Sequence, residues 1–179
     1  MEMKETDMKA RTIFLFTLTA AVVATAAMTV VPAAAQQAST TLMVHAVVVR
    51  NCTVVTTPVD FGNYDPLVNN RTQPLDQTGT VTVECTKGVA PTVELDTGQN
   101  PDGTNRRMAG GTAEFLGYEL YADPGRSTIW GTGTQGVTLP VSPGIGGAAT
   151  PQTIYGRVAA GQNVGPGDYT DTVNVTVVF

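Results

Sequence analysis

Short runs of alternating apolar and polar residues, separated by turn residues, constrain the fold more than any other feature of this sequence. The run "GTVTVECT", Gly79–Thr86, places Val81, Val83 and Cys85 on one face. Alternation with a period of two is the pattern of a β-strand with one buried face. Further strands are predicted at Thr41–Val49, Cys52–Val55, Val59–Tyr64, Pro91–Gly98, Glu114–Asp123, Thr153–Ala159 and Gly167–Phe179.

No segment after residue 35 keeps the i, i+3, i+4, i+7 apolar spacing of an amphipathic helix. Two segments rich in Gly, Pro and Asn, residues 100–111 and 132–151, are predicted to be loops. The first offers a hairpin turn at "PDG", and the second offers a short strand at "VTLPV". Many short strands joined by such turns predict an all-β sandwich or barrel.

The N-terminal residues have the composition of an export signal. Lys9 and Arg11 precede an uncharged apolar run, residues 12–31, and "AAA" at residues 33–35 offers a cleavage site before Gln36. A membrane anchor is the alternative, because the apolar run approaches spanning length. We predict a signal peptide at residues 1–35, an N-terminal extension at residues 36–50 and a single domain at residues 51–179.

Two cysteines, Cys52 and Cys85, are present. An even pair in an exported protein most simply forms a disulfide. Two free buried thiols are the alternative. A metal site is less favoured, because there is no third cysteine and His45 is the only histidine.

Several function classes find no support. Ten Lys and Arg against 15 Asp and Glu leave a net charge of −5, and the basic residues are scattered, which argues against a nucleic-acid partner. His45 lies in an apolar run with no nucleophile beside it, so neither an enzyme nor a cofactor is expected. Asp168 and Asp171 suit a turn before a strand. Trp130 and Tyr121 are expected in the core or at a sheet edge rather than in a sugar-binding patch.

The last residues predict a strand that is fixed in a sheet. Val173, Val175, Val177 and Phe179 share one face at period two. Chain ends are normally solvated, so a terminal segment this apolar needs a partner.

The N-terminal extension also has the pattern of a strand that needs a partner. Leu42, Val44, Ala46 and Val48 share one face, and the segment has no Gly, Pro or charge before Arg50. An exposed strand of this kind is an aggregation hazard. It either joins the sheet of its own domain or completes the sheet of another copy by strand addition.

The sequence resembles the spore coat protein U domain family, which includes subunits of archaic chaperone–usher pili. The resemblance runs in order from Val44 to Phe179. It is carried by "VVVRNCTVVTTPVDFGNYDP", "GTVTVECTKG", "LDTGQN", "RRMAGG", "LGYELYADPGRSTIWG" and "YGRVAAGQNVGPGDYTDTVNVTVVF". It implies an incomplete immunoglobulin-like β-sandwich that lacks its last strand, with an N-terminal donor-strand extension.

The resemblance also implies roles for particular residues and partners. A periplasmic chaperone would lend a strand to the open sandwich, and an outer-membrane usher would exchange it for the extension of the next subunit. The family's disulfide corresponds to Cys52 and Cys85. The residues that would fill the groove are Leu42, Val44, Ala46 and Val48. The C-terminal strand that would line the groove and meet the chaperone corresponds to Thr172–Phe179, through Val173, Val175, Val177 and Phe179. No catalytic residue or cofactor is implied.

These expectations describe a structural subunit of a surface fibre, exported through the periplasm and used in adhesion or biofilm formation. A monomeric secreted binding module, for example for a glycan, and a spore or cyst coat component are the alternatives. The monomeric module would require the first strand to fold into its own domain.

Overall fold

The computed structural model describes residues 34–111, 113–141 and 149–179. The predicted signal peptide therefore lies outside the described residues, apart from residues 34 and 35. The chain divides into two units, Met1–Val44 and His45–Phe179. In the described part of the first unit, residues 34–44 form no strand or helix and their side chains are exposed. No helix long and apolar enough to cross a membrane is found in the described parts of the chain.

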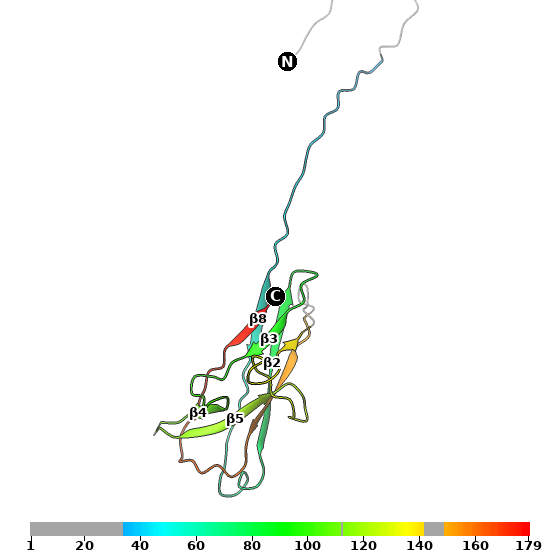
Figure 1. Ribbon diagram of the computed structural model, residues 1–179. Coiled ribbons are helices and arrows are strands. Elements are labelled where there is room, and N and C mark those ends of the chain that lie inside the picture. Colours follow the sequence, from blue (N-terminus) through cyan, green and yellow to red (C-terminus); the bar gives the residue numbers. More distant parts are fainter. Residues whose placement is uncertain (1–33, 112, 142–148) are drawn as a thin grey trace, which may run out of the picture. The chain divides into compact units, whose positions relative to one another are not determined.

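The second unit contains two antiparallel sheets (Figure 1). The larger sheet has five strands in the order β1-β2-β7-β5-β4. These strands are β1 (Cys52–Thr57), β2 (Leu75–Cys85), β4 (Arg106–Ala109), β5 (Phe115–Tyr121) and β7 (Gln152–Val158). The smaller sheet has the order β6-β3-β8, with β3 (Thr92–Leu95), β6 (Leu139–Pro140) and β8 (Val175–Val178).

The alternating residues form the core between the sheets. On β2 the predicted face is confirmed, because Val81, Val83 and Cys85 are buried while their neighbours are not. On β5 the same is true of Leu116, Tyr118 and Leu120. Val93 and Leu95 of β3 complete this core from the smaller sheet. The all-β prediction is confirmed by this arrangement.

Thr41–Val49 forms no strand within this chain, and its predicted pairing with another copy stays a prediction. Three other details of the predicted strands are wrong. No strand forms at Val59–Tyr64, because this segment has no ladder partner within the described residues. The last strand is shorter than Gly167–Phe179, since only Val175–Val178 pairs with β3. Conversely, part of the first predicted loop is β4, which pairs with β5. The turn before β4 closes through two main-chain hydrogen bonds between Asp102 and Asn105.

Candidate functional site

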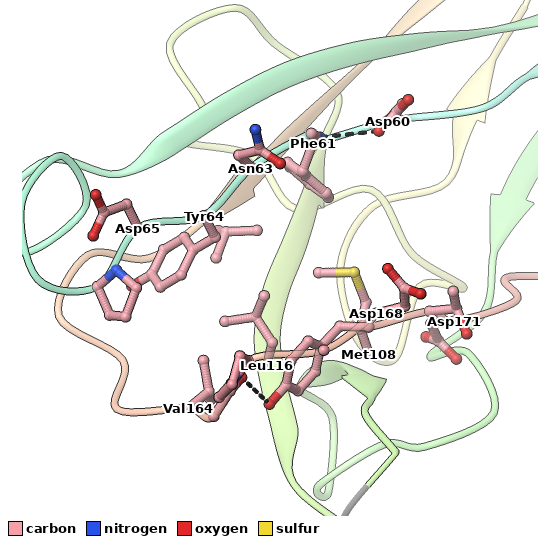
Figure 2. Close-up of a pocket in the computed structure, with 18 of the residues that line it drawn as sticks. Asp60, Phe61, Asn63, Tyr64, Asp65, Met108, Leu116, Val164, Asp168 and Asp171 are labelled. Atoms are coloured by element: carbon pink, nitrogen blue, oxygen red, sulfur yellow. Dashed lines mark hydrogen bonds between the residues drawn. The ribbon is translucent and has the colours of Figure 1, made fainter.

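A long groove of about 1150 Å³ lies between two segments that have no regular strand structure. Residues 58–67 form one wall and residues 163–171 form the other (Figure 2). Core residues of the larger sheet form the floor, namely Met108, Leu116 and Val158. The groove therefore opens onto the hydrophobic core.

The first wall continues directly from β1. The β1–β2 ladder ends at Thr57, and Val59 and Phe61 then turn toward the core as half-buried residues. Gly156 of β7 lets this wall approach the sheet, since an added Cβ there would lie 2.6 Å from Val59 and 2.8 Å from Phe61. The Phe61 ring meets the Tyr118 ring edge to face, with centroids 6.1 Å apart. Packing rather than backbone pairing positions this wall.

The second wall is attached to the larger sheet by hydrogen bonds. Thr170 and Ala109 exchange two main-chain bonds, 2.9 and 3.1 Å long. The Glu114 carboxylate accepts hydrogen bonds from the Gly165 N–H and, at 2.8 Å, from the Tyr169 hydroxyl. These two bonds hold the pKa of Glu114 below its usual value. A charged carboxylate therefore helps to position this side of the groove.

Asp171 extends the same wall toward β8. It accepts hydrogen bonds from the Tyr118 hydroxyl, at 2.7 Å, and from the Gln99 N–H, at 2.9 Å. Burial, and then the bond to Asp171, raise the pKa of Tyr118 far above that of a free tyrosine, so its hydroxyl stays protonated and donates. Asp171 is thus a structural acceptor, whereas Asp168 is exposed.

Two strands adjoin the walls along the chain, β1 before the first wall and β8 after the second, and each has a free edge. Within the described residues, β1 pairs only with β2 and β8 pairs only with β3. Val54 and Thr56 of β1 lie opposite the buried residues Val83 and Val81 and so face the same side. Val54 is nevertheless 39% exposed, and Thr56 is also exposed. The inner face of β1 therefore lacks the cover that another strand would supply.

The predicted C-terminal residues lie along the other side. Val173, Val175 and Val177 are half-buried against the core, while Asn174 and Thr176 between them are exposed. Phe179 continues this period but is 48% exposed. One face of the segment packs inward, and its end remains accessible.

The predicted donor residues are highly exposed. Leu42 and Val44 are each 86% exposed and Val48 is 82% exposed, and Ala46 is exposed as well. None of them belongs to a strand of this chain.

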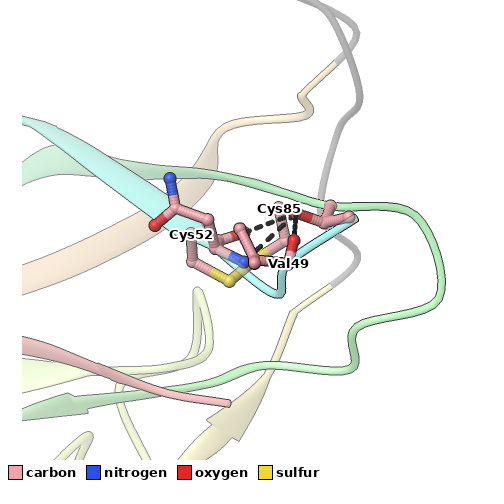
Figure 3. Close-up of a disulfide and its surroundings, with 5 residues drawn as sticks. Val49, Cys52 and Cys85 are labelled. Atoms are coloured by element: carbon pink, nitrogen blue, oxygen red, sulfur yellow. Dashed lines mark hydrogen bonds between the residues drawn. A yellow bond between two sulfur atoms is a disulfide. The ribbon is translucent and has the colours of Figure 1, made fainter. Parts of the chain in front are cut away.

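The residues that join the extension to β1 are fixed to β2 (Figure 3). Cys52 and Cys85 lie directly opposite each other in the β1–β2 ladder and form a disulfide. The Thr86 hydroxyl donates to the Val49 carbonyl and accepts from the Asn51 N–H, both at 3.1 Å. The Thr86 N–H also donates to the Asn51 carbonyl, at 2.9 Å. We call residues 49–52 the root of the extension.

Trp130 and His45 do not line the groove. The side chain of Trp130 is fully buried, and its indole N–H donates to the Val93 carbonyl. His45 is exposed. No group of three or more His, Cys, Asp or Glu side chains that could bind a metal occurs in residues 34–111, 113–141 and 149–179.

Several groove residues do not stand out in the sequence. The pattern around Val59 and Phe61 predicts a strand, although its alternation does indicate an inward face. Glu114 and Tyr169 lie 55 positions apart in the chain, and no local pattern connects them. In chemical terms the groove offers an apolar floor, and the two strands that adjoin its walls along the chain have unpaired edges, which suits an extended polypeptide segment.

Comparison with known proteins agrees with this geometry. The Spore Coat Protein U domain matches residues 38–176. "Protein U" of Myxococcus xanthus is 37% identical over 130 residues, which cover 68% of this chain and 71% of that protein.

Among solved structures, the fold is similar to a chain in the CsuC–CsuE chaperone–tip adhesion subunit pre-assembly complex from archaic chaperone–usher Csu pili of Acinetobacter baumannii. The TM-score is 0.52 and the sequence identity is 22%, and the similarity covers 74% of this chain and 40% of the other. This similarity concerns the fold, and it is consistent with the predicted immunoglobulin-like β-sandwich. The domain match over residues 38–176 and the 37% identity to "Protein U" lead to one conclusion: the chain belongs to the Spore Coat Protein U domain family.

Proposed function

We propose that this protein is a structural subunit of a surface fibre and that its copies join by donor-strand exchange. In this proposal residues 51–179 form the domain, and the groove between residues 58–67 and 163–171 accepts residues 36–50 of another copy. The observation that carries the proposal is that one chain combines a groove over the core, two edge strands that adjoin its walls along the chain, and an exposed apolar extension.

The physical basis is the burial of apolar surface and the pairing of free edges. Leu42, Val44, Ala46 and Val48 would enter the groove. Burying a side chain of valine or leucine size contributes about 1.5–3 kcal/mol, and each added main-chain hydrogen bond contributes about 1 kcal/mol net. The entropy lost by ordering the extension opposes these gains. A groove and an extension on different surfaces form a head-to-tail contact, which generates a fibre when it does not close into a ring.

The proposal includes partners and a route. A signal peptide at residues 1–35 would direct the chain to the periplasm, where a chaperone would complete the sandwich through its groove and Val173, Val175, Val177 and Phe179. An outer-membrane usher would then exchange the chaperone strand for the extension of the next subunit. The fibre would act in adhesion or biofilm formation. The 37% identity to "Protein U" and the family's name also support a coat component, which would be a structural assembly too.

Polymerisation of the full exported chain tests the proposal. Val48→Asp should abolish fibres seen by electron microscopy and sedimentation, because it places a charge on the face that enters the groove. Val47→Asp is the matched control, since it introduces the same charge on the opposite face of the same segment. If both variants lose fibres equally, or if neither loses them, the proposal that the face of Val48 enters the groove is contradicted.

A second experiment supplies the missing strand in trans. The Val48→Asp chain, with its own extension disabled, is heated alone and with a synthetic peptide of residues 36–49. Binding to the folded state alone raises Tm by mass action. A folded variant whose Tm does not change with the peptide would mean that the sandwich is already complete, as in a monomeric binding module.

A further inference from the structure

A loop at one end of the groove exposes two large apolar side chains. We call residues 65–70 the tip loop. Leu67 is 81% exposed and Val68 is 73% exposed. Neighbouring Asp65 and Pro66 are half-buried and, with Leu67, line the groove. The exposed pair is thus continuous with the proposed strand-binding surface.

The tip loop has a fixed conformation. The Asp65 carboxylate accepts hydrogen bonds from the N–H groups of Leu67, at 2.9 Å, and Val68, at 3.1 Å. The side chain of Asn70, which is only 5% exposed, accepts from the Asp65 N–H at 2.9 Å. The Asn70 carbonyl accepts from Gly161 N–H at 2.8 Å, which ties the loop to the turn before the second wall. Leu67 and Val68 are therefore presented at defined positions rather than on a loose segment.

Strand polarity indicates what lies beside this loop in a fibre. The first wall runs toward the tip loop, and the second wall and β8 run away from it. Each named ladder in the described residues is antiparallel. A strand that pairs antiparallel with β8, and therefore runs parallel to the first wall, runs toward the tip loop. The root of the incoming copy then leaves the groove at this loop.

The root limits how far the incoming domain can lie from the groove. From Val48, the last groove-filling residue, to Cys52 the chain spans at most about 14 Å. Over this length Thr86 fixes Val49 and Asn51, and the disulfide fixes Cys52. The domain of the incoming copy must therefore lie close to the tip loop of the copy that accepts its extension.

The two surfaces are complementary in chemistry. We define the root face as the exposed residues Val49, Arg50, Lys87 and Gly88. Val49 is 70% exposed and offers an apolar contact for the tip loop.

We infer that Leu67 and Val68 dock on the root face of the next copy, so that the tip loop forms a second contact between consecutive subunits beside the inserted strand. This inference rests on the proposed function. It adds a contact that would orient one domain relative to the next, because the short root limits the distance between the two domains but does not by itself set the angle between them.

Photo-crosslinking in fibres of the full chain tests the contact. A benzophenone amino acid replaces Leu67, and subunits with and without ¹⁵N are mixed before assembly. Mass spectrometry should find mixed-isotope crosslinks from position 67 to residues 49–52 or 86–88. The same probe at Val137, which is 38% exposed and lies outside the groove, is the control and should give no such crosslink. If the probe at 67 prevents assembly, it is placed at Val68.

The outcomes separate the two proposals. Fibres that give crosslinks from the tip loop to the root face support both. Fibres without such crosslinks, or with crosslinks only within one copy, overturn the tip-loop contact and leave donor-strand exchange standing. If the unmodified chain forms no fibres, the proposed function fails, and the contact fails with it.

Discussion

The Nη1 atom of Arg106 lies 2.6 Å from Oε1 of Glu119, and the Arg106 side chain has no exposed surface. The same guanidinium donates to the carbonyls of Leu95, at 2.9 Å, Asp96, at 2.8 Å, and Trp130, at 2.9 Å. Arg106 begins β4 in the larger sheet, and Leu95 ends β3 in the smaller one. One buried cation thus connects the two sheets of the sandwich.

Replacing Arg106 should be severely destabilising. Arg106→Ala leaves the Glu119 carboxylate and two buried carbonyls without their donor, and breaking a buried ion pair in this way costs about 3–5 kcal/mol. The adjacent Arg107 is the control, because its side chain is 29% exposed and lies 3.8 Å from Asp102. Arg107 also donates to the Asn100 and Pro101 carbonyls and lies over the Phe115 ring, but these contacts are at or near the surface, so Arg107→Ala should cost clearly less than Arg106→Ala, about 1–2 kcal/mol. Urea unfolding of both variants measures the difference, and equal losses would contradict it.

Removal of the disulfide should weaken the edge of the larger sheet. Cys52 and Cys85 are separated by 33 positions, for which the chain-entropy account gives about 3–4 kcal/mol. β1 pairs only with β2 among the described strands, so the covalent link also secures this strand. The double variant Cys52→Ala/Cys85→Ala should lose that free energy of unfolding in urea. Reduced wild-type chain should show the same loss, and an unchanged midpoint in either case would contradict the prediction.

Acid should loosen the second wall of the groove. The Gly165 N–H and the Tyr169 hydroxyl lower the pKa of Glu114 in the folded state. A lowered pKa contributes stability that is complete above the ordinary glutamate value, about 4.3, and is lost as the pH falls through the lower folded value. The free energy of unfolding, measured in urea between about pH 6 and pH 3, should therefore fall less steeply with decreasing pH in Glu114→Gln than in wild type. Identical slopes would show that Glu114 contributes nothing.

A charge at the accessible end of the C-terminal segment should prevent capture by the proposed chaperone. Phe179 is 48% exposed, so Phe179→Asp should leave the domain folded while it opposes burial under a donated strand. Thr176→Asp introduces the same charge on the exposed face and is the control. Co-purification from the periplasm measures capture, and melting checks that each domain is folded. Undiminished capture of Phe179→Asp would remove Phe179 from the chaperone site.

Alternation allows much of the framework to be predicted. The inward residues of β2 and β5 follow from period two, since a pleated strand can bury only every second side chain on one face. The apolar, uncharged character of residues 41–49 is likewise a property of the sequence, and it indicates that this segment needs a partner strand, either in its own domain or in another copy.

Pairing between distant segments decided which predicted strands form, which polar residues are buried and where the groove lies. Val59–Tyr64 alternates like a strand but forms none, because a strand needs a neighbour and this segment borders the groove. Arg106 lies in a polar stretch that has the composition of a loop, and only the meeting of β3, β4 and β5 buries it. The groove itself joins residues 58–67 to residues 163–171, which are about a hundred positions apart. The sequence by itself determined which faces are apolar, and the tertiary structure decided which of them remain uncovered, because cover depends on which distant segments pair.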